Sequence, residues 1–285
     1  MSVRLTAWGV FCFLLAGMLF GEPAPISRAR QLYLHTRYQE AIETLKGHNS
    51  PEAFRIVGQS WFMLGEFKKA CEAFEKAVQL EPANSENHLW LGRAWGRRAE
   101  TANPLLAPRY ASRARQSFEK AVELDPKNIL ALNDLFEYYM QAPGFLGGGK
   151  EKAAALAERI AALDAAEGHY VRARLAEDRR EFSKAEAQLR RAVEAAPASV
   201  GRIIDLAKFL AKRGRYQESE AEFEKAERIA PNSPKLLFER AATYIETKRN
   251  LDLAKILLQR YLESPLTPDD PPRSEAEKLL KLVGS

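Results

Sequence analysis

The chain has 285 residues, of which 46% are hydrophobic, 28% are charged and 9% are aromatic. This composition is typical of soluble globular proteins, and it excludes a disordered chain and a protein with many membrane spans. The formal net charge is only +5, and acidic and basic residues alternate along the chain, as in Glu72, Glu75 and Lys76. Nucleic-acid-binding proteins concentrate basic charge on one face, so we expect no nucleic-acid partner.

The amino-terminal segment, residues 1–21, has the pattern of an export signal. Arg4 precedes an uncharged run over residues 5–21, most of which is strongly apolar, and Glu22 ends that run. The apolar part is shorter than the ~20 residues that a transmembrane helix needs. We therefore expect a signal peptide over residues 1–21 and an exported protein that is periplasmic or secreted.

The cleavage of this segment has one open alternative and one consequence. Cleavage after Gly21 puts a small residue at the cut, but Leu19 does not fit the small residue expected two positions earlier, so an uncleaved membrane anchor over residues 1–21 stays open. Cleavage would remove Cys12 and leave Cys71 as the single cysteine. One cysteine cannot form an intramolecular disulfide, so the mature fold must depend on packing alone.

A regular period runs through the rest of the chain. The spacing between Gly58 and Gly92 is the same as that between Pro197 and Pro231, much later in the sequence. A fixed spacing of this length, about 34 residues, is typical of a repeat architecture, in which each repeat is one unit of two or more helices or strands.

One unit carries a nearly complete pattern of small and large residues. It reads Phe54-x2-Val57-Gly58-x2-Trp61, then Gly65-x-Phe67-x2-Ala70-x3-Phe74-x2-Ala77 and Pro82. This pattern resembles the tetratricopeptide repeat, a helix-turn-helix unit. A small residue such as Gly58 lets two antiparallel helices approach closely, and a large residue such as Phe74 fills the space between them. The resemblance implies an all-α fold, a right-handed superhelical solenoid of about seven such repeats.

The register predicts where each repeat begins. The seven units begin near Ala24, Pro51, Ser85, Ile129, Ala166, Val200 and Pro234. We expect the array to cover residues 22–265, and a C-terminal capping helix with a short tail to cover residues 266–285. An open stack must cover its apolar end, and Ala276 and Leu279 lie on one side of that last helix.

Two units are stretched. By comparison with their neighbours, the third contains about ten extra residues and the fourth about five. We expect the first insertion to lengthen the turn between two helices around residues 101–108, and the second to do the same around residues 142–149. Insertions in a solenoid lie in the loops between helices, so we expect the two to sit side by side at one edge of the array.

Residues 144–151 fit most of a phosphate-binding loop. The sequence has the form G-x4-G-K up to Lys150, but Glu151 stands where the motif needs Ser or Thr to hold magnesium, and the segment before it is a predicted helix. An elongated turn is the simplest interpretation. Glycine amides beside a lysine could still hold an anion, so a nucleotide- or anion-binding regulator that uses Gly147–Lys150 stays as a hypothesis.

The sequence lacks the residue patterns of common active sites. The four histidines, His35, His48, His88 and His169, are far apart and show no zinc-binding spacing, and Cys71 has no nearby histidine in the sequence. We therefore expect no enzymatic activity, no metal and no cofactor.

The resemblance also implies a ligand site. In tetratricopeptide arrays the first helix of each unit lines a concave groove, and unit positions 2, 5, 9, 12 and 13 face the ligand. Transferred to this chain, those positions give Arg55, Gln59, Phe62, Met63, Leu89, Arg93, Arg97, Asn133, Glu137, Met140, Tyr170, Arg174, Lys208 and Lys212. This mixture of basic, amide and apolar residues suits a peptide with some acidic character.

The predicted function is that of a scaffold or adaptor outside the cytoplasm, which binds a protein or peptide partner in its groove. The first alternative is an envelope assembly factor that residues 1–21 anchor in the membrane. The identity of the partner does not follow from the sequence.

Overall fold

The computed structural model describes residues 23–284, and within that range the chain forms fifteen α-helices and one short 3₁₀ helix. The α-helices are α1 (Ala24–Leu34), α2 (Tyr38–Thr44), α3 (Pro51–Met63), α4 (Phe67–Leu80), α5 (Ser85–Thr101), α6 (Ala107–Leu124), α7 (Ile129–Gln141), α8 (Lys150–Leu163), α9 (Ala165–Asp178), α10 (Phe182–Ala195), α11 (Val200–Lys212), α12 (Tyr216–Ile229), α13 (Pro234–Glu246), α14 (Leu251–Glu263) and α15 (Arg273–Val283). The 3₁₀ helix η1 covers Gly144–Leu146. The predicted export signal lies outside the described residues.

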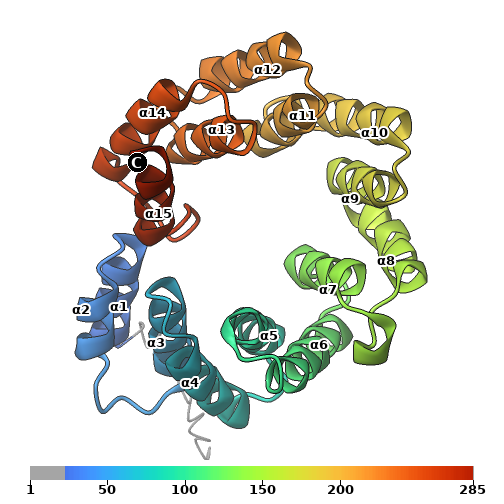
Figure 1. Cartoon of the computed structure of the whole chain (residues 1–285). Helices are drawn as coiled ribbons and strands as arrows, with labels where there is room; N and C mark the ends of the chain where they lie inside the picture. The colour runs from blue at the N-terminus through green and yellow to red at the C-terminus, as the bar shows by residue number, and fades with distance from the viewer. Residues whose placement is uncertain (1–22, 285) are drawn as a thin grey trace, which may run out of the picture.

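The helices pack as consecutive antiparallel pairs, which confirms the predicted all-α solenoid. The first helix of each pair begins at the predicted residue in six units and one residue early in the fifth, at Ala165. Figure 1 shows that the pairs follow a curve, with the odd-numbered helices from α1 to α13 on its inner side and the even-numbered helices outside. The first helix of every unit therefore contributes to one concave face.

Side-chain caps fix the start of the inner helices. From α3 to α13, each inner helix is preceded by a Ser, Asn or Asp whose side-chain oxygen accepts a hydrogen bond from a backbone N–H three residues later. These caps are Ser50, Asn84, Asn128, Asp164, Ser199 and Ser233. Each cap satisfies one of the unpaired amides of a helix start, so the boundary between two units is set locally.

Several of the turns between the two helices of a unit contain a residue in the left-handed conformation. Gly65 and Gly214 have φ angles of 76° and 75°, as expected for residues that end the first helix. Arg180 and Lys248 take the same conformation at the equivalent turns, with φ angles of 58° and 54°. A side chain is disfavoured in this region, so the fifth and seventh units hold their turns at a cost in free energy.

The two helices of a unit touch where the inner helix carries glycine. A Cβ atom placed on Gly58 would lie 2.6 Å from the ring of Phe74, and one on Gly92 would lie 2.5 Å from the ring of Phe118. The glycine of each pair is buried, and so are both rings. These contacts confirm the predicted role of the repeat's small residues, because nothing larger than glycine leaves room for the aromatic ring.

The insertion in the third unit differs from its prediction. The sequence comparison predicts a longer turn, but α5 has 17 residues where α3 has 13, and α6 has 18 where α4 has 14. Most of the extra residues therefore add a turn to each helix, leaving residues 102–106 as the connection. The physical reason is packing: Trp95 stacks on Tyr110 across the longer pair, with ring centroids 5.3 Å apart.

The insertion in the fourth unit is a connection, as predicted. It contains η1, and the hydroxyl of Tyr138 donates a hydrogen bond of 2.9 Å to the carbonyl of Leu146. The η1 segment packs against α6 of the preceding unit. The two stretched units therefore contact each other on this side of the array.

The C-terminal helix covers the end of the stack and also reaches its beginning. Ala276 is buried, and Leu279 packs against the cluster of buried apolar residues that α13 and α14 form, as expected of a capping helix. Figure 1 shows α15 beside α1, and a cavity of about 330 Å³ is lined both by Tyr38 and Met63 and by residues of the C-terminal segment. The array is therefore a nearly closed ring in which the first and last units meet.

The glycine contacts predict a contrast within one helix. Gly92→Ala should lower the free energy of unfolding by about 1–3 kcal/mol, because the added methyl group overlaps the ring of Phe118. Gly96→Ala in the same helix should raise it by about 0.5–1 kcal/mol, because nothing lies within 4 Å of the new Cβ and alanine favours the helix. Urea unfolding followed by circular dichroism measures both. Equal effects of the two substitutions would contradict the assigned helix contact.

Candidate functional site

The concave face contains two neighbouring cavities. The larger, here called the central cavity, has a volume of about 500 Å³ and lies between α7, α9 and α11. It is lined by Met140, Gln141, Lys150, Tyr170, Arg174, Glu177, Asp178, Leu189, Asp205, Lys208, Phe209 and Lys212. The smaller, here called the adjacent cavity, has a volume of about 250 Å³ and is lined by Phe62, Arg93, Gly96, Arg97, Glu100, Phe118, Asp134, Glu137, Tyr138 and Gln141. Gln141 belongs to both linings.

Nine of the fourteen residues predicted for the groove line these two cavities. In the central cavity they are Met140, Tyr170, Arg174, Lys208 and Lys212, and in the adjacent cavity they are Phe62, Arg93, Arg97 and Glu137. Met63 lines the cavity beside the C-terminal segment instead. Arg55, Gln59 and Asn133 are half-buried on inner helices and line neither of the two cavities.

The prediction for Leu89 is wrong. Leu89 is 2% exposed and lies in the same cluster of buried apolar residues as Phe74 of α4. This side of the first turn of α5 faces the preceding unit, where a leucine gains more free energy from burial than it would on the groove surface.

Carboxylates on neighbouring inner helices pair with the basic residues of the groove. The pairs are Arg55 with Glu86 (3.2 Å), Arg93 with Asp134 (2.5 Å), Arg174 with Glu137 (2.8 Å), Lys208 with Glu239 (2.6 Å) and Lys212 with Glu246 (3.3 Å). Arg97 pairs with Glu100 of its own helix at 2.8 Å and lies 3.8 Å from Glu275 of α15. We call this set the ion-pair ladder. It removes the basis for expecting an acidic partner, because every cation predicted for the groove already has an anionic neighbour.

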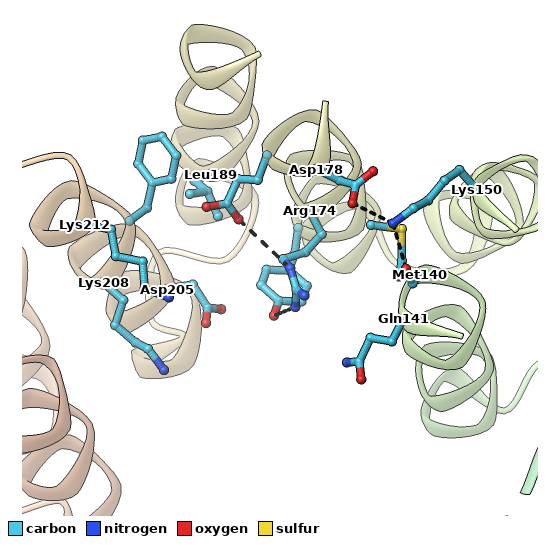
Figure 2. Close-up of a pocket in the computed structure, with 12 residues that line it drawn as sticks. Met140, Gln141, Lys150, Arg174, Asp178, Leu189, Asp205, Lys208 and Lys212 are labelled. Carbon is cyan, nitrogen blue, oxygen red and sulfur yellow. Dashed lines mark hydrogen bonds and ion pairs between the residues drawn. The ribbon is translucent and has the colours of Figure 1, made fainter. Parts of the chain in front are cut away.

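Figure 2 shows how the central cavity is built. Lys150 crosses from the start of α8, donating to the carbonyl oxygen of Met140 at 2.7 Å and to Oδ1 of Asp178 at 2.5 Å. The hydroxyl of Tyr170 accepts a hydrogen bond of 3.3 Å from Arg174 on the next turn of α9. Asp205 projects from α11 between Lys208 and Arg174, and no dashed line reaches it.

Asp205 is a charged group of this cavity that lacks a hydrogen bond from any described residue. No hydrogen-bond donor among the described residues reaches its Oδ2 atom, and the nearest cation is Nη2 of Arg202 at 3.4 Å. Burial raises the pKa of Asp205 from its ordinary value of 3.8 to about 6. The charges of Arg202, Lys208 and Lys235 act against that rise, while Glu167 adds to it.

A second carboxylate of the cavity, that of Glu177, also lacks a hydrogen bond from any described residue. Its closest cation is Nε of Arg174 at 4.0 Å, which is too long for a hydrogen bond. Burial raises the pKa of Glu177, and the charges of Arg174, Lys212 and Arg213 oppose the rise. Two carboxylates with unused hydrogen-bonding capacity therefore face the same cavity.

The sequence reasoning missed Glu177, Asp178 and Asp205. A signal was available for the first two, because they occupy positions 12 and 13 of the fifth unit, where the repeat register places groove residues. Asp205 occupies position 6 of its unit, which is not among the positions that the resemblance places in the groove.

The amides of the three consecutive glycines in the glycine-rich loop already donate hydrogen bonds within the protein. The N–H groups of Gly147, Gly148 and Gly149 donate to the carbonyls of Gly144, Pro143 and Tyr139 at 2.8, 3.3 and 3.0 Å. Lys150 is paired with Asp178, as described above. The loop therefore joins α7 to α8 as an elongated turn, and its geometry does not favour a phosphate-binding role.

The part of the chain that the structure describes contains neither a cluster of metal-binding side chains nor a membrane-spanning helix. Over residues 23–284, no group of three or more His, Cys, Asp or Glu side chains is arranged to hold a metal ion. In the same range, no helix is both long enough and apolar enough to cross a bilayer.

The raised pKa of Asp205 predicts how stability changes with pH. The folded chain holds this proton more tightly than the unfolded chain, so the stabilisation is complete below pH 3.8 and is lost as the pH rises through about 6. Asp205→Asn should therefore raise the free energy of unfolding by about 1–2 kcal/mol at pH 7.5 and leave it unchanged near pH 4. Urea unfolding at both pH values tests this.

Asp178→Asn is the matched control for that experiment. Asp178 accepts a hydrogen bond of 2.5 Å from Lys150, so its loss should destabilise the chain at pH 7.5. A destabilising effect of Asp205→Asn equal to that of Asp178→Asn would show that Asp205 is a satisfied structural group.

Comparisons with known proteins agree with this architecture. The family profile of the tetratricopeptide repeat matches residues 51–84 and residues 203–233. A search of curated proteins found no match.

Several solved structures share the fold. A tetratricopeptide repeat protein from Parabacteroides merdae is 14% identical, with a TM-score of 0.60 over 92% of this chain and 98% of that one. A thermophilic tetratricopeptide repeat protein from Thermus thermophilus is 22% identical, with a TM-score of 0.52 over 69% of this chain and 97% of that one. The human IFIT1 dimer with PPP-AAAA is 19% identical, with a TM-score of 0.54 over 84% of this chain and 54% of that one.

The two profile matches coincide with helix pairs of the observed array. Residues 51–84 contain α3 and α4, and residues 203–233 contain most of α11 and all of α12. The remaining helix pairs continue the same stacking around the ring. The chain is therefore a tetratricopeptide repeat protein.

Proposed function

We propose that this protein is a protein–protein interaction scaffold that binds an extended segment of a partner along its concave face. The observation that carries the proposal is that the central and adjacent cavities meet at Gln141. A segment lying across Gln141 would contact α5, α7, α9 and α11 together. Tetratricopeptide arrays in general bind protein partners, and the central cavity has the volume of a specific ligand site rather than of a flat surface.

The lining of the groove supports a peptide ligand over a purely apolar one. Met140, Tyr170 and Phe62 supply apolar area, while Gln141 and the ion-pair ladder supply polar groups at intervals. Interfaces with proteins combine these features, with a few aromatic or methionine contacts inside a polar rim. We expect binding to depend on a small number of these residues.

We also propose that the protein acts outside the cytoplasm. The support is the sequence pattern of residues 1–21, where a single basic residue precedes an apolar run that ends at Glu22. If this segment is kept, the same array becomes a membrane-anchored assembly factor, with residues 23–284 held at the membrane surface.

The first experiment tests the groove with a matched pair of substitutions. Gln141→Trp places a large ring where the two cavities meet, and Gln79→Trp places the same ring on the outer helix α4, where the side chain is exposed. The full chain with a C-terminal tag is used to capture partners from cell extracts, and mass spectrometry identifies them. We expect Gln141→Trp to reduce the captured partner at least tenfold and Gln79→Trp to leave it unchanged. Retention of the partner by both variants would place the binding surface elsewhere.

The second experiment determines the amino terminus of the chain in fractionated cells. The export proposal predicts a mature chain that begins near Glu22 and is found outside the cytoplasm. Mass spectrometry of the purified protein measures this directly. A chain that keeps residues 1–21 in the membrane fraction would replace the free scaffold with the anchored form, and a chain that keeps them in the cytoplasm would contradict both.

A further inference from the structure

The cations that line the central cavity all have ion-pair partners, whereas two of its carboxylates have no hydrogen bond from a described residue. Each of its four cations has a carboxylate within ion-pair distance: Lys150 with Asp178, Arg174 with Glu137, Lys208 with Glu239 and Lys212 with Glu246, at 2.5, 2.8, 2.6 and 3.3 Å. An anionic ligand entering the cavity would compete with these internal partners. The cations therefore offer little unused binding capacity to an acidic group.

Two of the three carboxylates that line the cavity lack hydrogen bonds. The Oδ2 atom of Asp205 accepts none from any described residue, and its nearest cation, Arg202, is shared with Glu167 at 3.6 Å. Glu177 has only the 4.0 Å approach of Arg174, whose Nη1 and Nη2 atoms already donate to Glu137 at 2.8 and 3.2 Å. A partly buried carboxylate without a hydrogen-bond donor costs free energy, and a ligand that supplies the donor recovers it.

Both carboxylates remain within reach of a ligand. The Oδ2 atom of Asp205 is itself buried, so a ligand must approach this carboxylate from its other oxygen; the side chain as a whole is 23% exposed. The side chain of Glu177 is 32% exposed, and both side chains line the cavity. They come from different inner helices, α11 and α9, so a donor placed between these helices can approach both. This arrangement favours a ligand with several N–H donors and a positive charge.

The rest of the lining suits a long side chain. Met140, Leu189 and Phe209 form apolar parts of the wall, against which the methylene groups of a lysine or arginine can pack while the charged head reaches the carboxylates. One side chain does not fill about 500 Å³, so the cavity also has room for the residues on either side of it.

We propose that the central cavity binds a basic side chain, lysine or arginine, of the partner segment, and that Asp205 and Glu177 accept its hydrogen bonds. This inference rests on the proposed function and names the chemistry of the ligand. It replaces the acidic partner expected from the sequence with a basic one. In this proposal the ion-pair ladder keeps the basic side chains of the groove paired with carboxylates of the protein itself.

The test uses three blocked tripeptides, which are acetylated at the amino end and amidated at the carboxyl end. Their sequences are Gly-Arg-Gly, Gly-citrulline-Gly and Gly-Glu-Gly, so that citrulline keeps the shape of arginine without its charge. Binding to the full chain is measured by isothermal titration calorimetry at pH 7.5 and low salt. We expect saturable binding of the arginine peptide, at least tenfold weaker binding of the citrulline peptide, and no binding of the glutamate peptide.

The matching protein variants are the double substitution Asp205→Asn with Glu177→Gln, and the control Glu72→Gln on the exposed surface of the outer helix α4. The double variant should bind the arginine peptide at least tenfold more weakly, while the control keeps the wild-type affinity. Circular dichroism verifies that each variant is folded. Tighter binding of the glutamate peptide, equal affinity of the double variant, or no binding of the arginine peptide would each overturn the proposal.

The outcome can be separated from that of the scaffold proposal. If Gln141→Trp loses a captured partner but the double variant keeps it, the groove function stands and the basic-residue site is wrong. If the arginine peptide binds and no partner is captured, the site stands and the scaffold function is wrong.

Discussion

The close contact between a glycine on each of two inner helices and an aromatic ring on its outer helix is the constraint on which this architecture depends. At Gly58 and Gly92 the space for a Cβ atom is already filled by Phe74 and Phe118. This contact sets how near the two helices of a unit lie, and hence how the next unit stacks on them. Continued stacking along the chain places the inner helices side by side around the concave face.

This arrangement brings charges of neighbouring units together. Individual ion pairs at a partly exposed surface contribute about 0–1 kcal/mol each, so the ion-pair ladder is not the main source of stability. Its consequence is chemical, because it occupies the basic side chains that would otherwise attract acidic ligands. In the lining of the central cavity, the carboxylates of Asp205 and Glu177 are left without a hydrogen bond from any described residue. The protein thus keeps two costly groups in its central cavity, which is typical of a site where stability is exchanged for binding.

Much of the fold could be predicted from the sequence, because each repeat is defined by local features. Proline and glycine positions and the regular repeat spacing placed the start of every inner helix within one residue of its observed position. The prediction for the insertion in the third unit is wrong, since its length alone does not tell whether extra residues extend a turn or two helices. Packing of Trp95 on Tyr110 favours the helices.

The groove was less predictable, because its properties depend on pairs of residues that are far apart in the sequence. Arg93 and Asp134, or Arg174 and Glu137, meet only after the units have stacked. Most of the groove residues that the register identified do line the cavities, but the register could not show that their charges are already matched. Nor could it show that α15 returns to the first units, since that contact depends on the curvature summed over the whole ring.

The central claim is that the cavity contains carboxylates in need of a cationic donor, and the most direct measurement is the titration of Asp205 itself. Selective ¹³C labelling of the aspartate carboxyl groups, with assignment by Asp205→Asn, allows this by NMR. The structure predicts a pKa of about 6 in the free chain, and a lower value when the arginine peptide is bound, because a nearby positive charge favours the ionised carboxylate. A titration near the ordinary value of 3.8 that does not respond to the peptide would contradict the account.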